Sequence, residues 1–335
     1  MCIRDRWYLE SKGHSVVIGN PEYSESKMNT ILKTWAENPD IDAAIISGMG
    51  TGAIVAGIKA MTDAGKLVII TNCEAGYAPM VPFSIMFDSY GSCKKAAEKV
   101  VEMLEEKYGS PQGTIILSIC DPSDPDLNAR ASGFRDVFNQ YPEIEVYEIS
   151  APEDRVAGAE TQCITLLRTL PKVDAICSVE YEGTLGIIQA LQSEGKLLPA
   201  DDPNHIILCG VDAGPGPVYE AIKSTAMDFA IDQPVFAYNP LAAYYALKIL
   251  AGETVEFSPG DVINAEDVDI TFTVPKVGIE EPGISWAPAT VIDVTEEYGH
   301  VRIGTQAVWI TSENADDPAL WFNVAAVLDV VGWGL

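Results

Sequence analysis

Residues 42–66 read DAAIISGMGTGAIVAGIKAMTDAGK, and residues 174–196 read DAICSVEYEGTLGIIQALQSEGK. In both stretches an Asp-Ala pair opens a short apolar run of the kind that forms a buried strand. A glycine-containing turn then leads into a helical pattern, which ends at an A-G-K or E-G-K triplet. Because one supersecondary plan occurs twice, the sequence predicts two similar α/β lobes.

Strand and helix patterns alternate between these two stretches and around them. The expected strands are 15–20, 42–47, 67–71, 84–87, 114–119, 145–149, 175–179, 206–211 and 227–231. The expected helices are 7–12, 23–38, 53–64, 89–108, 128–139, 155–170, 184–193, 218–224 and 239–250. Such alternation predicts βαβ units with parallel sheets, whose facing strand ends form a ligand cleft. Residues 254–310 are instead rich in Val, Ile, Thr, Pro and Gly, which predicts β-hairpin or extended structure.

Composition narrows the function classes. The formal charge of −28 over 335 residues argues against nucleic acid as a partner, because phosphate contacts need clustered Lys and Arg. No apolar run of ~18 residues predicts a membrane span, and residues 1–14 contain no apolar leader core. The seven cysteines form no C-x-x-C, and there are three histidines. We therefore expect neither a disulfide framework nor a metal or other cofactor.

Residues 48–53, GMGTGA, fit the dinucleotide pattern G-x-G-x-x-G/A, and Glu74 follows the next strand. This pattern makes an NAD-linked oxidoreductase one alternative. The other interpretation is that the glycines only form a tight turn at a helix start. The second copy, at 182–186, breaks the spacing and favours the turn. Because no P-loop, G-x-S-x-G or H-E-x-x-H occurs, we do not expect an enzyme.

A candidate ligand-binding arginine lies in residues 127–134, LNARASGF, after the strand at 114–119. Arg130 would face the crevice at the carboxyl ends of the strands, where α/β sheets bind ligands. Its planar fork of donors suits hydroxyl or carboxylate oxygens. Alternatively, Arg130 pairs with Asp126 or Asp136 on the helix surface.

Polar residues also follow other apolar strands. With Arg130 they would form a ring of hydroxyl-binding groups, although each could instead be a turn or N-cap residue. These residues are Asn72, Glu180, Asp212 and Asp232. Tyr181 could offer a flat apolar face to a sugar ring, or be an ordinary core or surface aromatic.

Several motifs occur together in a specific order. They are R-x-x-G-F at 130–134, D-A-I at 174–176 with L-G at 185–186, G-V-D at 210–212, D-Q-P at 232–234 and I-T-S-E-N at 310–314. With them, most of residues 7–252 and the tail resemble the sugar-type periplasmic solute-binding proteins of ABC transporters (type I, ribose-binding-protein-like). The resemblance implies two Rossmann-like lobes of flavodoxin-like strand order, joined by a hinge. It also implies the substrate-binding component of an ABC importer, which closes over a monosaccharide or similar polyhydroxylated molecule.

The same resemblance implies ABC permease membrane subunits as partners, a monomer, and a periplasmic or extracellular, membrane-attached location. It places Arg130, Asp212 and the position of Glu180 on the sugar, and either Asp232 or Gln233 beside them. Asn72, and Ser89 beside Asp88, stand near positions that the family uses for its ligand. The ligand-sensing core of a LacI-type regulator shares this fold and is a further alternative, although the acidity and the I-T-x-E-N tail favour the receptor.

We assign residues 1–88 and 233–256 to the N-terminal lobe and residues 89–232 to the C-terminal lobe. Residues 257–309 would be a β-rich insertion, and residues 310–335 a tail near the hinge. The first six residues, MCIRDR, match nothing around them, and the chain enters near the end of the family's first helix. We therefore expect an N-terminal truncation that removes the first strand of the lobe together with any leader.

Overall fold

The computed structural model describes residues 2–49, 52–214, 216–273, 280–281, 286–318, 320 and 322–323. These residues form two compact units. Unit 1 comprises residues up to Phe87 and residues 234–306, and unit 2 comprises residues 88–233 and 307–323. The β-rich segment after residue 256 therefore lies mostly in unit 1, and the described part of the tail lies in unit 2.

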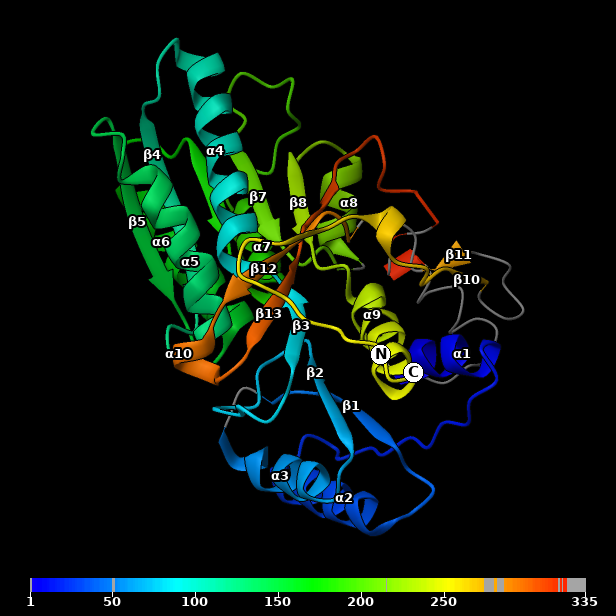
Figure 1. The fold of residues 1–335 in the computed structure, drawn as a ribbon. Coiled ribbons are helices and arrows are strands. Elements are labelled where there is room, and N and C mark those ends of the chain that lie inside the picture. Colours follow the sequence, from blue (N-terminus) through cyan, green and yellow to red (C-terminus); the bar gives the residue numbers. More distant parts are fainter. Residues whose placement is uncertain are drawn as a thin grey trace. The chain divides into compact units, whose positions relative to one another are not determined.

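Unit 2 contains a six-stranded sheet of order β14-β8-β7-β6-β4-β5, parallel except for β14 (Figure 1). Its strands are β4 (Gly113–Cys120), β5 (Ile144–Ser150), β6 (Ala175–Ser178), β7 (Ile207–Val211), β8 (Phe229–Asp232) and β14 (Val308–Ile310). Its helices are α4 (Ser89–Tyr108), α5 (Pro125–Phe138), α6 (Arg155–Thr169), α7 (Tyr181–Ser193) and α8 (Pro217–Lys223). The order of its first five strands along the chain, 2-1-3-4-5, confirms the predicted flavodoxin-like arrangement.

Local sequence explains where these helices begin. Asp88, Asp124 and Asp154 each accept a backbone N–H of the following helix, which satisfies donors that the first turn leaves unpaired. Strands β6 and β7 are buried throughout, as expected for parallel strands covered on both faces. Helices α6, α7 and α8 share one hydrophobic core with the sheet, while α4 and α5 pack against each other.

Unit 1 contains a second sheet, of order β1-β2-β3-β13-β12-β9. The elements before residue 88 are α1 (Cys2–Ser11), α2 (Glu25–Glu37), β1 (Ala43–Ser47), η1 (Gly52–Ile54), α3 (Val55–Asp63), β2 (Leu67–Thr71) and β3 (Phe83–Phe87). The later ones are α9 (Val235–Leu250), β9 (Val262–Ile263), η2 (Ala265–Asp267), β10 (Phe272–Thr273), β11 (Glu280–Glu281), β12 (Ala289–Asp293), α10 (Thr295–Tyr298) and β13 (Val301–Thr305).

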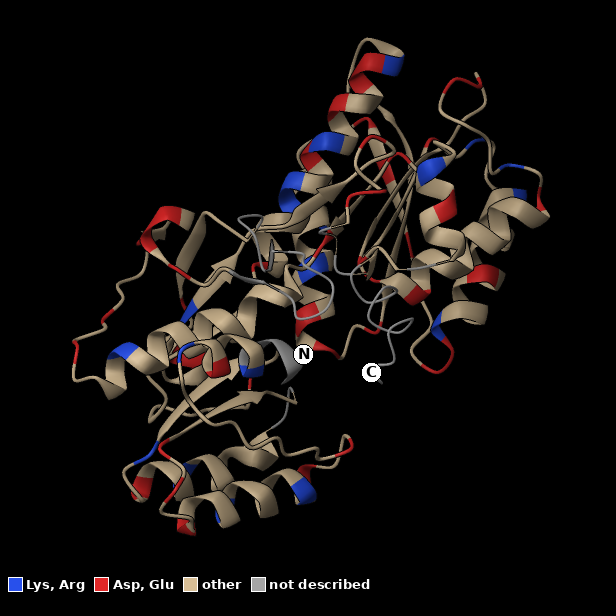
Figure 2. Ribbon diagram, turned by 90° about the vertical axis from the view of Figure 1, so that its right-hand side faces the viewer, with Lys and Arg blue, Asp and Glu red and all other residues tan. Residues whose placement is uncertain are grey.

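Acidic residues recur along the helices and loops of both units (Figure 2).

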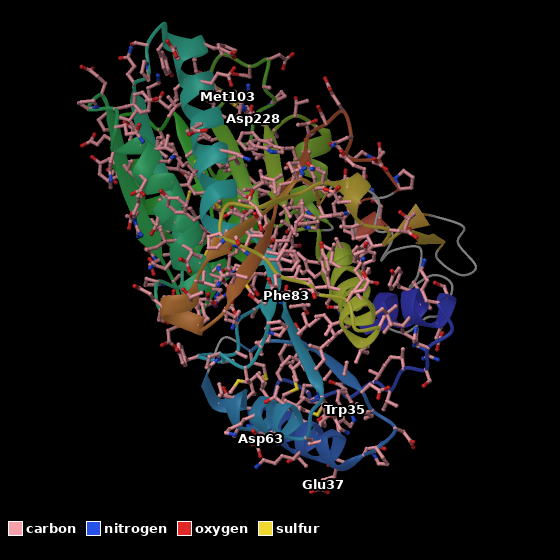
Figure 3. All side chains as sticks on the ribbon, in the orientation of Figure 1. Trp35, Glu37, Asp63, Phe83, Met103 and Asp228 are labelled. Carbon is pink, nitrogen blue, oxygen red and sulfur yellow. The ribbon has the colours of Figure 1, made fainter. Side chains whose placement is uncertain are left out.

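The β-rich segment is thus part of the sheet of unit 1. Strand β13 runs parallel to β3 and antiparallel to β12. Phe83 on β3, labelled in Figure 3, meets the rings of Tyr245 and Phe257 edge-on, with centroids 5.7 and 5.1 Å away. Such edge-to-face contacts are favourable arrangements of aromatic rings. They pack α9 and the start of the β-rich segment onto the sheet.

The predicted strand at residues 15–20 is wrong, because these residues form no strand. A strand exists only where a neighbour completes its hydrogen bonds. The end strand of the sheet, β1, pairs only with β2 among the described strands. Residues 15–17 and 43–45 instead line a cavity of about 200 Å³, together with Leu9, Trp35 and Leu247.

A buried ionic cluster joins β3, β13 and the loop after β2. The Glu74 carboxylate accepts from Ser84 Oγ at 2.9 Å, from Arg302 Nη2 at 2.9 Å and Nε at 3.0 Å, and lies 3.2 Å from His300 Nε2. Burial by itself would raise the pKa of Glu74. The hydrogen bond from His300 and the charge of Arg302 outweigh it and lower that pKa. Glu74 is therefore held as a buried carboxylate.

Candidate ligand-binding site in unit 2

Polar side chains gather at the carboxyl ends of the parallel strands of unit 2. Asp121 follows β4, Glu180 lies two residues after β6, Asp212 follows β7 and Gln233 follows β8. The backbone of Asp212 is left-handed, with φ 64°, a conformation that Asp tolerates better than most residues. Residues with backbone conformations of this rare kind are often found at functional sites. This edge of the sheet is where ligands bind in open α/β folds.

Arg130 lies at the centre of this group. Its Nη1 donates to Asp212 Oδ2 at 2.8 Å and to the Val179 carbonyl at 2.9 Å. Asp212 Oδ1 in turn accepts from Gln233 Nε2 at 2.8 Å. Burial opposes the charge of Arg130, but the nearby Asp212 carboxylate prevails and raises the pKa of the guanidinium. Arg130 is only 6% exposed, so it does not lie on the helix surface as the alternative required.

The R-x-x-G-F motif has a local physical reason. Helix α5 begins after its cap Asp124 and carries Arg130 in its second turn. A Cβ on Gly133 would lie 2.5 Å from the Tyr90 carbonyl and 2.9 Å from the Lys94 nitrogen, both on α4. Phe134 is fully buried. Glycine thus allows the close α4–α5 contact, and Phe134 anchors the helix that presents Arg130.

Glu180 occupies the N-cap position of α7, but its side chain makes no capping hydrogen bond. Its Oε2 instead accepts from Arg155 Nη1 at 2.6 Å. Burial raises the pKa of Glu180, while a hydrogen bond with the Cys120 side chain and the charge of Arg155 oppose that rise. Beside it, the half-buried ring of Tyr181 packs against Gly214, where a Cβ would come within 2.3 Å of the ring.

Arg155 is a site residue that the sequence prediction missed. It is the first residue of α6 and forms ion pairs with Glu180 at 2.6 Å, and with Asp121 and Glu182 at 3.6 Å. Its position at the start of a helix was a signal that the sequence already contained. A cation in the first turn of a helix opposes the helix dipole, so it needs compensating carboxylates nearby.

The remaining predicted residues make other contacts. Asp232 ends β8 in a buried position, and its Oδ1 accepts from the Gln233 backbone at 2.9 Å. Asp88 caps α4 through Gly91 N at 2.9 Å, and the buried Ser89 begins that helix. Asn72 belongs to unit 1, where its backbone has φ 69° and its amide donates to Cys73 Sγ at 3.3 Å.

The structure favours the turn interpretation of residues 48–53 over a dinucleotide site. Gly50 and Thr51 lie outside the described residues. A Cβ on Gly48 would lie 1.8 Å from the Cys73 carbonyl, so glycine is needed there for packing. Glu74, which a dinucleotide would need on its ribose, is engaged by Ser84, His300 and Arg302.

Among the residues that the structure describes, no group of three or more His, Cys, Asp or Glu side chains is arranged to hold a metal ion. No helix in the same residues combines the length and apolar character needed to cross a membrane.

The chain is similar in sequence and in fold to known binding proteins. Residues 6–254 match the periplasmic binding protein domain family. The D-apiose import binding protein of Actinobacillus succinogenes is 22% identical over 227 residues, which are 67% of this chain and 70% of that protein. A sugar-binding protein of a Bacillus halodurans sugar ABC transporter superposes with TM-score 0.69 at 17% identity, covering 94% and 93% of the two chains. A solute-binding protein from Agrobacterium radiobacter in complex with D-arabinose gives 0.64 at 16%, covering 95% and 90%.

Proposed function

Because the chain belongs to the periplasmic binding protein domain family, we propose that it is the substrate-binding component of an ABC importer. Its ligand is a monosaccharide or a similar polyhydroxylated small molecule, which it delivers to membrane permease subunits. It acts as a monomer outside the cytoplasmic membrane, attached to that membrane, and without catalysis, nucleic acid or cofactor. The chain passes between the units near residues 87–88, 233–234 and 306–307, and closure on the ligand would bend these segments.

The observation that carries this proposal is the hydrogen-bonded group of Arg130, Asp212 and Gln233. It combines a cationic donor, an anionic acceptor and an amide at the ligand-binding edge of a parallel sheet. A sugar hydroxyl both donates and accepts, so it can bond to each of these groups. The proposed contacts in unit 2 are these three residues with Glu180, Tyr181 and Asp232, followed by Asp88 and Ser89. Asn72 is the candidate contact in unit 1.

Relatives indicate which sugars to test. Similar proteins are described as binding D-arabinose, myo-inositol and D-allose, and another as a D-apiose import protein. We expect the purified chain to bind at least one of these four compounds in isothermal titration calorimetry. Arg130→Met should weaken that binding about tenfold or more, since it removes a charged hydrogen-bonding partner worth ~1.5–3 kcal/mol.

A matched control lies on the same helix. Arg135 pairs with Glu148 at 2.8 Å but is partly exposed and outside the site. Arg135→Met should leave the affinity unchanged. If the wild type binds none of the four compounds, the proposed ligand class is wrong. If both variants lose affinity equally, Arg130 has no specific role.

A further inference from the structure

One carboxylate at the candidate site has an unused oxygen. The Glu180 side chain is 9% exposed, and its Oε2 accepts from Arg155. Its Oε1 is buried and accepts no N–H or O–H hydrogen bond in the described part of the chain, and the weak thiol donor of Cys120 is the group that lies near the carboxylate. An ionised carboxylate can accept at both oxygens, and a buried acceptor left without a donor destabilises the fold. Glu180 Oε1 therefore lacks a strong donor among the described residues.

The partner of Glu180 stands in an unusual place. Arg155 begins α6, where the positive end of the helix dipole disfavours a cation. Its side chain is 30% exposed and faces the carboxylates of Glu180, Asp121 and Glu182. A residue that breaks a local preference while serving several partners is expected at a functional site.

We propose that Glu180 determines ligand specificity and that Arg155 is its positioning residue. Arg155 occupies one oxygen of Glu180, so that the other accepts a hydrogen bond from a ligand hydroxyl or ammonium group. With this arrangement the site binds neutral sugars or amino sugars and does not bind sugar acids. This inference rests on the proposed function and specifies its ligand class.

The surrounding charges support this selection. Glu180 faces Cys120 from β4, Arg130 from α5, Arg155 from α6 and Glu182 from α7. The carboxylates of Asp121, Glu180, Glu182, Asp212 and Asp232 outnumber the guanidinium groups of Arg130 and Arg155 at this edge of the sheet. An added ligand carboxylate would meet like charges at close range, whereas a hydroxyl or ammonium group would not.

The first test needs no ligand. The Glu180 carboxyl resonance is followed by carbon-13 NMR in glutamate-labelled protein and is assigned by its absence in Glu180→Gln. Arg155→Met should raise its titration midpoint, because one cation that lowers the pKa of Glu180 is lost, while Cys120 and Arg130 remain. Arg155→Lys should restore the midpoint in part. Arg168→Met is the control, since Arg168 lies on the same helix and pairs with the distant Glu194 at 2.7 Å. An unchanged midpoint in Arg155→Met would overturn the positioning role.

The second test uses the neutral compound that binds best among D-arabinose, D-allose, D-apiose and myo-inositol. On acidification its affinity should fall several-fold at a higher pH in Arg155→Met than in the wild type, because Glu180 takes up its proton at a higher pH. Arg168→Met should follow the wild type. Wild-type binding of D-glucuronate or D-galacturonate as tight as that of the neutral compound would overturn the rejection of acids.

The outcomes separate the two proposals. A wild type that binds none of the neutral compounds contradicts the proposed function, while the NMR titration still decides the role of Arg155. A wild type that binds them, with the same pH profile in Arg155→Met, contradicts only this inference.

Discussion

Replacing Arg302 by Met tests whether the buried ionic cluster holds the β-rich segment in the sheet of unit 1. The Arg302 and Glu74 side chains are 14% and 5% exposed, and two hydrogen bonds of 2.9 and 3.0 Å join them. The variant removes the guanidinium but leaves the Glu74 carboxylate inside. Breaking a buried pair in this way costs about 3–5 kcal/mol, because the remaining charge is uncompensated.

The lower end of that range, about 3 kcal/mol, is the better expectation here. Ser84 Oγ still donates to Glu74 at 2.9 Å, and His300 Nε2 remains 3.2 Å away. Adding Glu74→Gln to Arg302→Met should restore part of the stability, since a buried amide costs less than a buried unpaired charge.

The assay is urea unfolding followed by circular dichroism, with hydrogen-exchange protection of β3 and β13 as a local readout. Lys59→Met is the control, because the Lys59–Asp63 pair of 2.7 Å is 60% and 63% exposed. Such an exposed i,i+4 pair contributes about 0.3–0.5 kcal/mol. The reasoning fails if Arg302→Met costs no more than Lys59→Met, or if the double variant is less stable than Arg302→Met.

Two further predictions concern other parts of the chain. Burial opposes the charge of His205, but its contact with Asp228 at 3.0 Å prevails and raises the pKa of His205. A group with a raised pKa stabilises the fold fully below its unfolded pKa of about 6.5. The unfolding free energy should therefore fall as pH rises through the raised pKa, and urea titrations of His205→Gln should lack that fall. Gly48→Ala should cost about 1–3 kcal/mol in the same assay, because its Cβ would lie 1.8 Å from the Cys73 carbonyl. Gly52→Ala has open space around its Cβ and should be near neutral, so equal effects would argue against the packing role of Gly48.

Local patterns in the sequence were enough to predict most elements. The apolar run at 67–71 is β2, and the amphipathic stretch at 89–108 is α4, with the predicted bounds. The repeated plan at 42–66 and 174–196 falls in two different units of the structure. These features could be predicted because hydrophobic period and turn residues act on neighbouring positions.

The predicted strand at residues 15–20, which the structure does not contain, shows the limit of such patterns. Residues 15–20 have the composition of a strand, yet Val17 is 62% exposed and none of the described strands pairs with them. Whether an apolar run becomes a strand depends on the edge beside it. Similarly, the alternating runs after residue 254 predicted β structure but not that β13 would pair with β3, more than 200 residues earlier.

The sequence by itself therefore determined the α/β class and the repeated plan, because these depend on residue type and short spacing, whereas the family resemblance pointed to Arg130. Only the tertiary structure decided the partners of the charged groups. Arg130 bonds to Asp212, 82 residues away, and Arg302 bonds to Glu74, 228 residues away. Arg155 became a candidate site residue only when folding brought Asp121, Glu180 and Glu182 around it. The energy of a charge depends on burial and on what lies within a few ångströms, and chain order specifies neither.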